Sequence, residues 1–206
     1  MPVRARVPHG VLCSCMRVIF RRTGERRYAV IVSVPGTAPH IMSPAPGFDR
    51  HIPHDLVHYV VEAELGLDAG VFGRAARGGG TFHATATAIN AREQARRRRK
   101  QTRRELALRR IPAHEEQLRT SERLAALCDL AWRRRHGQRP DPGFWPPESP
   151  SSALDSARIE RVVSRLDELA VLWNQLPVGG ELAFAWPGLA GAVREPARAS
   201  AALGRR

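Results

Sequence analysis

The chain has 206 residues, 43% of them hydrophobic, and a formal net charge of +13, which together indicate one domain with an apolar core and an anionic partner. No run of apolar residues approaches the roughly 18 that a membrane-spanning helix needs, and no secretory signal is visible at the N-terminus. Three cysteines without the spacing of a disulfide framework favour the reducing cytoplasm. From these features together we expect a cytoplasmic protein with no membrane segment.

A β-hairpin is predicted near the N-terminus. Residues 1–15 show no periodicity, and we treat them as an N-terminal extension, with Met16 as an alternative translation start. Two runs rich in Val, Ile, Phe and Tyr, residues 16–22 and 26–34, flank a Thr-Gly turn and predict two antiparallel strands. The proline-rich residues 35–50 predict a loop that leads to the first helix.

Start and stop residues predict four helices in the middle of the chain. Pro53 suits the first turn of a helix, and Gly66 is a natural C-terminal stop for it. The glycine triplet at 78–80 ends the second helix, and Pro112 separates the third helix from the fourth. The predicted ranges are 53–65, 69–77, 91–111 and 112–136.

A fifth predicted helix has the clearest pattern in the chain. Residues 154–176 space their apolar side chains alternately three and four apart, which is a heptad seam that needs an apolar partner. We expect the helix at 112–136 to supply this partner, so that the two form a long antiparallel hairpin across the proline-rich connection at 138–153. An alternating run at 178–187 then predicts a third strand beside the N-terminal hairpin.

These elements predict an α+β fold. A small antiparallel sheet of about three strands is expected to pack on helices that include the long antiparallel helical hairpin. Residues 16–187 would form this single domain, and residues 188–206 are expected to be a disordered tail.

Two histidines four residues apart mark a candidate metal site in the stretch "PHDLVHYVVEAE" at 53–64. On a helix, His54 and His58 lie at one edge of the apolar arc, and Asp55 and Glu62 border them on the polar side. Side chains four apart on one face can share a metal ion, because their Cβ atoms lie about 6 Å apart. A plainer interpretation is that both histidines are partly buried and hydrogen-bonded to a carboxylate or to the backbone.

The segment from His54 to His58 resembles the H-E-x-x-H signature of the zincin metalloproteases, with Asp55 in place of the glutamate. This resemblance implies that both histidines bind Zn²⁺ or another divalent metal and that Asp55 is the catalytic base. The pattern departs from the family because aspartate is one methylene shorter and because Pro53 puts the pair in the first helical turn. A third ligand would come from Glu62, which we favour, or from Glu64, His51 or His83.

A longer stretch, "APGFDRHIPHDLVHYVVEAELGLDAGVFG", resembles a group of small bacterial proteins, mostly from high-GC actinobacteria. In this group a short hairpin precedes a PHDLVH-type helix, and a Leu-Pro-x-Gly-Gly strand, here "LPVGGELAFAWP", lies near the C-terminus. The resemblance covers about 16–82 and 154–187, and it implies no particular activity.

The predicted helix at 91–111 is strongly basic, with ten basic and two acidic residues between positions 92 and 110. Such a helix can lie along phosphates, with an affinity that falls steeply with salt, and no aromatic side chain interleaves it for base stacking. Because 32 of the 33 basic residues of the chain are arginines, a merely solvated helix in an arginine-rich composition is the alternative. The candidate nucleic-acid-binding residues are Arg96, Arg97, Arg98, Arg99, Lys100, Arg103 and Arg104.

The first hypothesis from the sequence is therefore a non-catalytic, cytoplasmic binding module that contacts nucleic acid or an acidic protein through this basic helix. The alternative is a divalent-metal-binding protein, or a zincin-like hydrolase, that uses the histidine helix. Neither hypothesis specifies a substrate or an oligomeric state.

Overall fold

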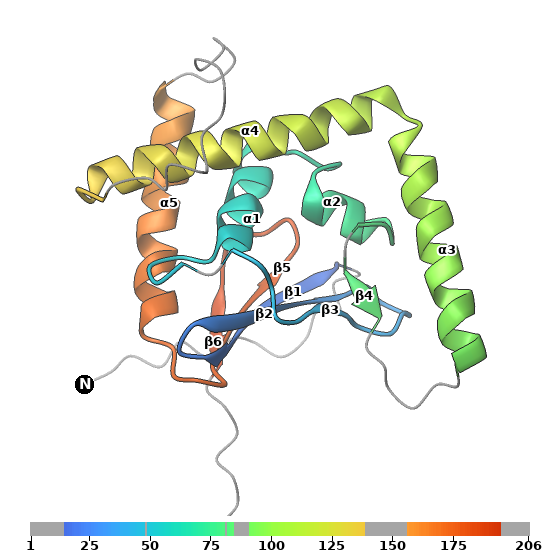
Figure 1. Ribbon diagram of the computed structural model, residues 1–206. Coiled ribbons are helices and arrows are strands. Elements are labelled where there is room, and N and C mark those ends of the chain that lie inside the picture. The colour runs from blue at the N-terminus through green and yellow to red at the C-terminus, as the bar shows by residue number, and fades with distance from the viewer. Residues whose placement is uncertain (1–14, 48, 81, 85–90, 139–155, 195–206) are drawn as a thin grey trace, which may run out of the picture.

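The computed structural model describes residues 15–47, 49–80, 82–84, 91–138 and 156–194. Within them the chain forms an antiparallel sheet whose strand order is β4-β3-β2-β1-β5-β6. The helices that pack on this sheet lie on one side of it, as Figure 1 shows. The α+β class predicted from the sequence is therefore confirmed.

The centre of the sheet is the predicted hairpin. Strands β1 (Arg17–Gly24) and β2 (Arg27–Ser33) pair with each other, and β5 (Glu181–Ala185) adds to the free edge of β1 as expected. Alternate side chains of each strand face the helices, and this inward row is buried. It consists of Val18, Phe20, Tyr28, Val30, Val32, Leu182 and Phe184.

The sheet is wider than the three strands expected from the sequence. Short strands extend both edges: β3 (His40–Met42) and β4 (His83–Ala84) beyond β2, and β6 (Ala192–Arg194) beyond β5. Strand β3 lies in the stretch predicted as a loop, and β6 lies in the stretch predicted as a disordered tail. Strands of two or three residues are too short to show a period of two, which explains why the sequence did not reveal them.

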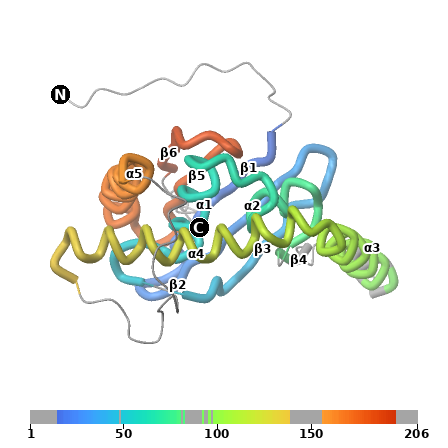
Figure 2. Tube along the Cα trace, turned by 90° about the horizontal axis from the view of Figure 1, so that it is seen from above, coloured from blue at the N-terminus to red at the C-terminus, as the bar shows by residue number. Residues whose placement is uncertain are grey.

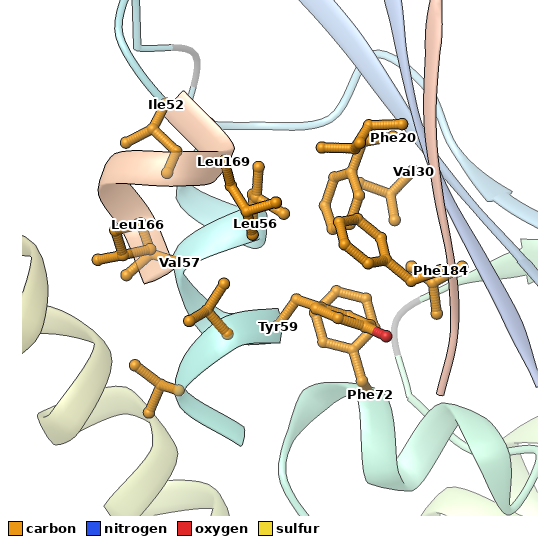
Figure 3. Packing of buried hydrophobic residues seen from close by; sticks show 14 of the residues in the cluster. Phe20, Val30, Ile52, Leu56, Val57, Tyr59, Phe72, Leu166, Leu169 and Phe184 are labelled. Carbon is orange, nitrogen blue, oxygen red and sulfur yellow. The ribbon is translucent and has the colours of Figure 1, made fainter. Parts of the chain in front are cut away.

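The core lies between the sheet and the nearest helices. Helix α1 (His54–Leu65), helix α2 (Val71–Ala76) and helix α5 (Ser156–Asn174) place their apolar faces against the inward row of the sheet. Figure 3 shows Tyr59 of α1 and Phe72 of α2 directed toward Phe20 and Phe184 of the sheet. Tyr59 and Phe72 have centroids 5.2 Å apart in an edge-to-face arrangement, so α1 and α2 pack as one layer.

Two long helices complete the fold. Helix α3 (Ala91–Arg109) and helix α4 (Pro112–Arg135) are separated at Pro112, as predicted. Helix α4 lies across α1 and α5 on the side away from the sheet, and α3 lies at the margin of the molecule (Figures 1 and 2). No helix among the described residues is long and apolar enough to cross a membrane.

The predicted antiparallel pairing of α4 with α5 is wrong in its geometry. Figures 1 and 2 show that α4 crosses α5 steeply instead of running along it. The polar contacts between them gather at the C-terminal end of α4, where Trp132 Nε1 donates to Asp167 Oδ1 at 2.8 Å and His136 Nε2 lies 2.7 Å from the same atom. The seam of α5 is instead divided between α4, α1 and the sheet.

Several predictions fall on parts of the chain outside the described residues. They are the N-terminal extension, of which only residue 15 is described, the connection at 138–153 beyond Gln138, and the tail from residue 195 onward.

Candidate metal centre

Two helices bring together the candidate metal ligands. His54 and His58 lie one turn apart at the start of α1, where Pro53 precedes the first turn. Helix α4 crosses above them and contributes Glu122. One ligand atom from each of these three side chains lies within 4.8 Å of the other two. The structure thus brings both predicted histidines together and pairs them with a carboxylate that we had not predicted.

The spacing of these atoms resembles that of ligands around a small metal ion. His58 Nε2 lies 3.1 Å from His54 Nε2 and 3.4 Å from Glu122 Oε2. In a tetrahedral site with bonds of about 2.0–2.1 Å, neighbouring ligand atoms are about 3.3 Å apart. The Glu122 side chain is 58% exposed, so the carboxylate can rotate to complete the geometry, and the site opens to solvent on its side.

A buried hydrogen-bond chain orients the His58 ring through Nδ1, the nitrogen that faces away from the ligand cluster. Its Nδ1 lies 3.2 Å from Ser121 Oγ, and the Ser121 hydroxyl donates to Glu62 Oε1 at 2.7 Å. Because the serine has a single proton and gives it to Glu62, its oxygen accepts from His58 Nδ1–H. The proton of the neutral imidazole is then on Nδ1, which leaves the Nε2 lone pair facing His54 and Glu122. This arrangement is the usual outer-shell support of a metal-bound histidine.

Burial keeps both histidines neutral. His58 is only 3% exposed, and burial, assisted by the neighbouring His54, lowers its pKa to about 3. The pKa of His54 is also lowered, mainly by burial and further by Arg133, while Asp129 acts in the opposite direction. A neutral imidazole is the form that binds a metal, so neither ring has to lose a proton at pH 7.

Glu62, the predicted third ligand, has a different role. Its carboxylate is 1% exposed and caps the N-terminus of α2, where Oε1 accepts from Val71 N–H at 2.6 Å and Oε2 from Phe72 N–H at 2.9 Å. Burial raises its pKa to about 7, although hydrogen bonds from Ser121 and from the α2 amides oppose this shift. Glu62 therefore supports His58 through Ser121 and does not reach the ligand cluster.

Asp55, the predicted catalytic base, is directed toward the sheet. Its Oδ2 accepts a hydrogen bond from the Tyr28 hydroxyl at 2.5 Å, and the residue is 8% exposed. Burial raises its pKa to about 6, the Tyr28 hydrogen bond lowers it, and the charge of Glu122 raises it further. A carboxylate engaged in this way joins α1 to β2 and is not positioned as the zincin glutamate would be.

The connectivity Ser121–His58–Glu122 also resembles a catalytic triad, but its burial argues against that role. Ser121 is fully buried, and its hydroxyl proton is given to Glu62. A nucleophilic serine must be reachable by substrate and must give its proton to the histidine. We therefore assign Ser121 to the support of His58.

The remaining candidate ligands lie elsewhere. Neither Glu64 nor His51 belongs to the ligand cluster formed by the described residues, and His51 packs its ring against Trp132, with centroids 6.4 Å apart. The side chain of His83 is outside the described part of the chain. The sequence does not identify Glu122 as a ligand, because there it is an acidic residue next to an arginine on α4, as is usual on an exposed helix face.

A glycine packs directly on the first histidine. Gly47 has a φ of +70°, and a Cβ built there would lie 2.9 Å from His54 Cβ. We expect Gly47→Ala to destabilise the fold by about 2 kcal/mol in urea unfolding and to displace His54. Gly36→Ala is the matched control, because Gly36 has a φ of +73° and open space around it. Equal losses in the two variants would show that only backbone strain matters at Gly47.

The predicted nucleic-acid-binding residues are all on α3. Six of them, Arg96, Arg98, Arg99, Lys100, Arg103 and Arg104, are exposed, and the side chain of Arg97 is outside the description. They are far along the chain from the histidines and belong to a different surface.

Comparisons with known proteins leave the site to be interpreted from its own geometry. No protein family matches the chain, and neither a curated protein nor a solved structure is found to be similar to it. The resemblance to the actinobacterial group therefore stays an interpretation of the sequence. The chemistry of the site is argued from His54, His58 and Glu122 and from the Ser121–Glu62 support behind them.

Proposed function

We propose that this protein binds a divalent metal ion through His54 Nε2, His58 Nε2 and a carboxylate oxygen of Glu122. The observation that supports this most is the convergence of these three ligand atoms within 4.8 Å of one another. The outer-shell chain from His58 through Ser121 to Glu62 supports it independently, because it directs the Nε2 lone pair toward the proposed ion.

The donor set favours a metal of the zinc type. Two imidazoles and one carboxylate suit Zn²⁺ and similar ions, whereas Mg²⁺ and Ca²⁺ prefer oxygen ligands alone. Three protein ligands leave a fourth tetrahedral position for water on the exposed side of Glu122. An ion bound there would supply Lewis acidity and lower the pKa of that water. Since Asp55 is hydrogen-bonded to Tyr28, the proposal is metal binding and does not extend to a zincin-type mechanism.

The decisive experiment compares two glutamates of α4. The protein, prepared without a histidine tag, is stripped with a chelator and titrated with Zn²⁺ by isothermal calorimetry. We expect one Zn²⁺ per chain for the wild type and an affinity at least tenfold lower in Glu122→Gln. Mutating an outer-shell partner lowers metal affinity by about 10–100-fold, and losing a direct ligand should cost at least as much.

Glu116→Gln is the matched control, since Glu116 is also exposed on α4 and its ion pairs are with the nearby Arg119 and Arg123. It removes the same charge and should bind Zn²⁺ like the wild type. The proposal fails if the wild type binds no stoichiometric Zn²⁺, or if both variants lose affinity equally.

A further inference from the structure

Helix α3 contacts the body of the protein through the side chains of Gln101, Glu105 and Leu108. Gln101 donates to Gly80 O at 3.2 Å and to Phe82 O, and Glu105 Oε2 accepts from Gly80 N–H at 2.7 Å. Glu105 also accepts from the buried Arg74 at 2.9 Å, and Leu108, one turn further, is partly buried. These three α3 positions, spaced four and three apart, define the inward side of the helix.

The opposite side of α3 carries a row of arginines. Arg92, Arg96, Arg99 and Arg103 are spaced four, three and four apart, and each of them is exposed. At about 100° per residue they lie within about 60° of one another and about 180° from Gln101. At 1.5 Å per residue, successive members are about 4.5–6 Å apart along the axis. We call these four residues the arginine row.

The position of α3 leaves this row accessible. Figures 1 and 2 show α3 at the edge of the molecule, beyond α2 and the end of the sheet, with its outer side turned away from the other elements. The helix has nine basic and two acidic residues, hence a net charge of +7. One of the two acids, Glu105, is turned inward and paired with Arg74 and Arg109. Its charge therefore does not neutralise the row.

We propose that the arginine row binds the phosphate backbone of a nucleic acid, independently of the proposed metal centre. Guanidinium groups match phosphate oxygens in a bidentate geometry, and a straight row at regular steps suits a polymer with regularly repeated phosphates. An α-helix also fits the major groove of B-DNA, which is about 12 Å wide.

The composition of α3 favours nucleic acid over an acidic protein. Protein interfaces concentrate their binding energy in buried aromatic and apolar anchors. Positions 92–103 contain no aromatic residue and no aliphatic residue larger than alanine. Binding would then depend on phosphates alone, with little preference for base sequence.

The test measures how salt changes the affinity of the full chain for a fluorescent 24-bp duplex DNA and for a single-stranded RNA of the same length. For the duplex, log Kobs should fall linearly with log [NaCl]. In the variant R92Q/R96Q/R99Q/R103Q this slope should become less steep by about 3.6, because each phosphate contact contributes about 0.9. Tighter binding to the duplex or to the RNA identifies which form of the backbone is preferred.

The control variant R26Q/R27Q/R158Q/R161Q replaces four arginines that are exposed elsewhere, on the β1–β2 turn, β2 and α5. It has the same net charge as the row variant, but none of its four substitutions is on α3. The slope of log Kobs against log [NaCl] should therefore change by less than about 1. Circular dichroism checks that both variants fold, and R99Q/R103Q, with half the expected change, serves if the quadruple variant does not. The inference is overturned by absence of salt-dependent binding, by equal changes in row and control variants, or by polyglutamate competing as well as DNA.

Discussion

Replacing His58 with alanine is expected to abolish the stabilisation of this protein by zinc. His58 Nε2 is the ligand atom that lies close to both others, at 3.1 Å from His54 Nε2 and 3.4 Å from Glu122 Oε2. At a free Zn²⁺ concentration of 100 times Kd, binding stabilises the wild type by about 2.7 kcal/mol. For a chain of this size, that corresponds to a rise in Tm of roughly 5–10 °C, which differential scanning calorimetry resolves.

The measured quantity is the difference in Tm with and without Zn²⁺ within each variant. Stability lost because the buried ring is removed lowers both Tm values and therefore cancels in this difference. His136→Ala is the control, because His136 is an exposed histidine just after the C-terminal end of α4, where it pairs with Asp167 of α5. It should keep the full zinc-induced shift. The proposed centre would be contradicted if Zn²⁺ raised the Tm of His58→Ala as much as that of the wild type, or if it did not raise the Tm of the wild type.

Replacing Arg74 with methionine is expected to cause the largest loss of stability in the absence of metal. Arg74 is 2% exposed and donates to Glu105 at 2.9 Å and to Glu115 at 2.7 Å. It also donates to the carbonyl oxygens of Ala69 and His114. Breaking a buried ion pair costs about 3–5 kcal/mol, and we expect about 3, because both carboxylates are partly exposed and can regain water.

Urea unfolding followed by circular dichroism measures this loss, with Arg77→Met as the control. Arg77 is also an arginine of the α2 region, but it is exposed and pairs with Asp68 at the surface. Surface pairs contribute about 0–1 kcal/mol, so the control should remain close to the wild type. Similar losses in both variants would show that Arg74 is not the link that joins α2 to α3 and α4.

Arg74 also connects the stability of the fold to the proposed functions. Its two carboxylate partners belong to different helices, Glu105 to α3 and Glu115 to α4. The same α4 carries Ser121 and Glu122 to the histidines, and the same α3 carries the arginine row. The side chain that holds these two helices on the body therefore helps to position both surfaces.

The candidate site was predicted from the sequence in part. The histidine pair could be recognised because both ligands lie on one helix, where a spacing of four residues determines that they share a face. Glu122 could not be recognised, because its place beside them depends on how α4 crosses α1. Glu62 lies on the same face as His58, but the amides of α2 capture its carboxylate, and this competition exists only in the folded chain.

Local pattern by itself determined the five helices of the described residues, the central hairpin, the third strand beside it and the concentration of charge on α3, because each depends on residues adjacent in the chain. Tertiary structure alone decided the edge strands β3, β4 and β6, the steep crossing of α4 over α5, and the side of α3 that faces solvent. Pairing across a sheet and packing between helices depend on contacts between distant residues, such as Trp132 with Asp167 and Glu105 with Arg74. No periodicity within one segment encodes such contacts.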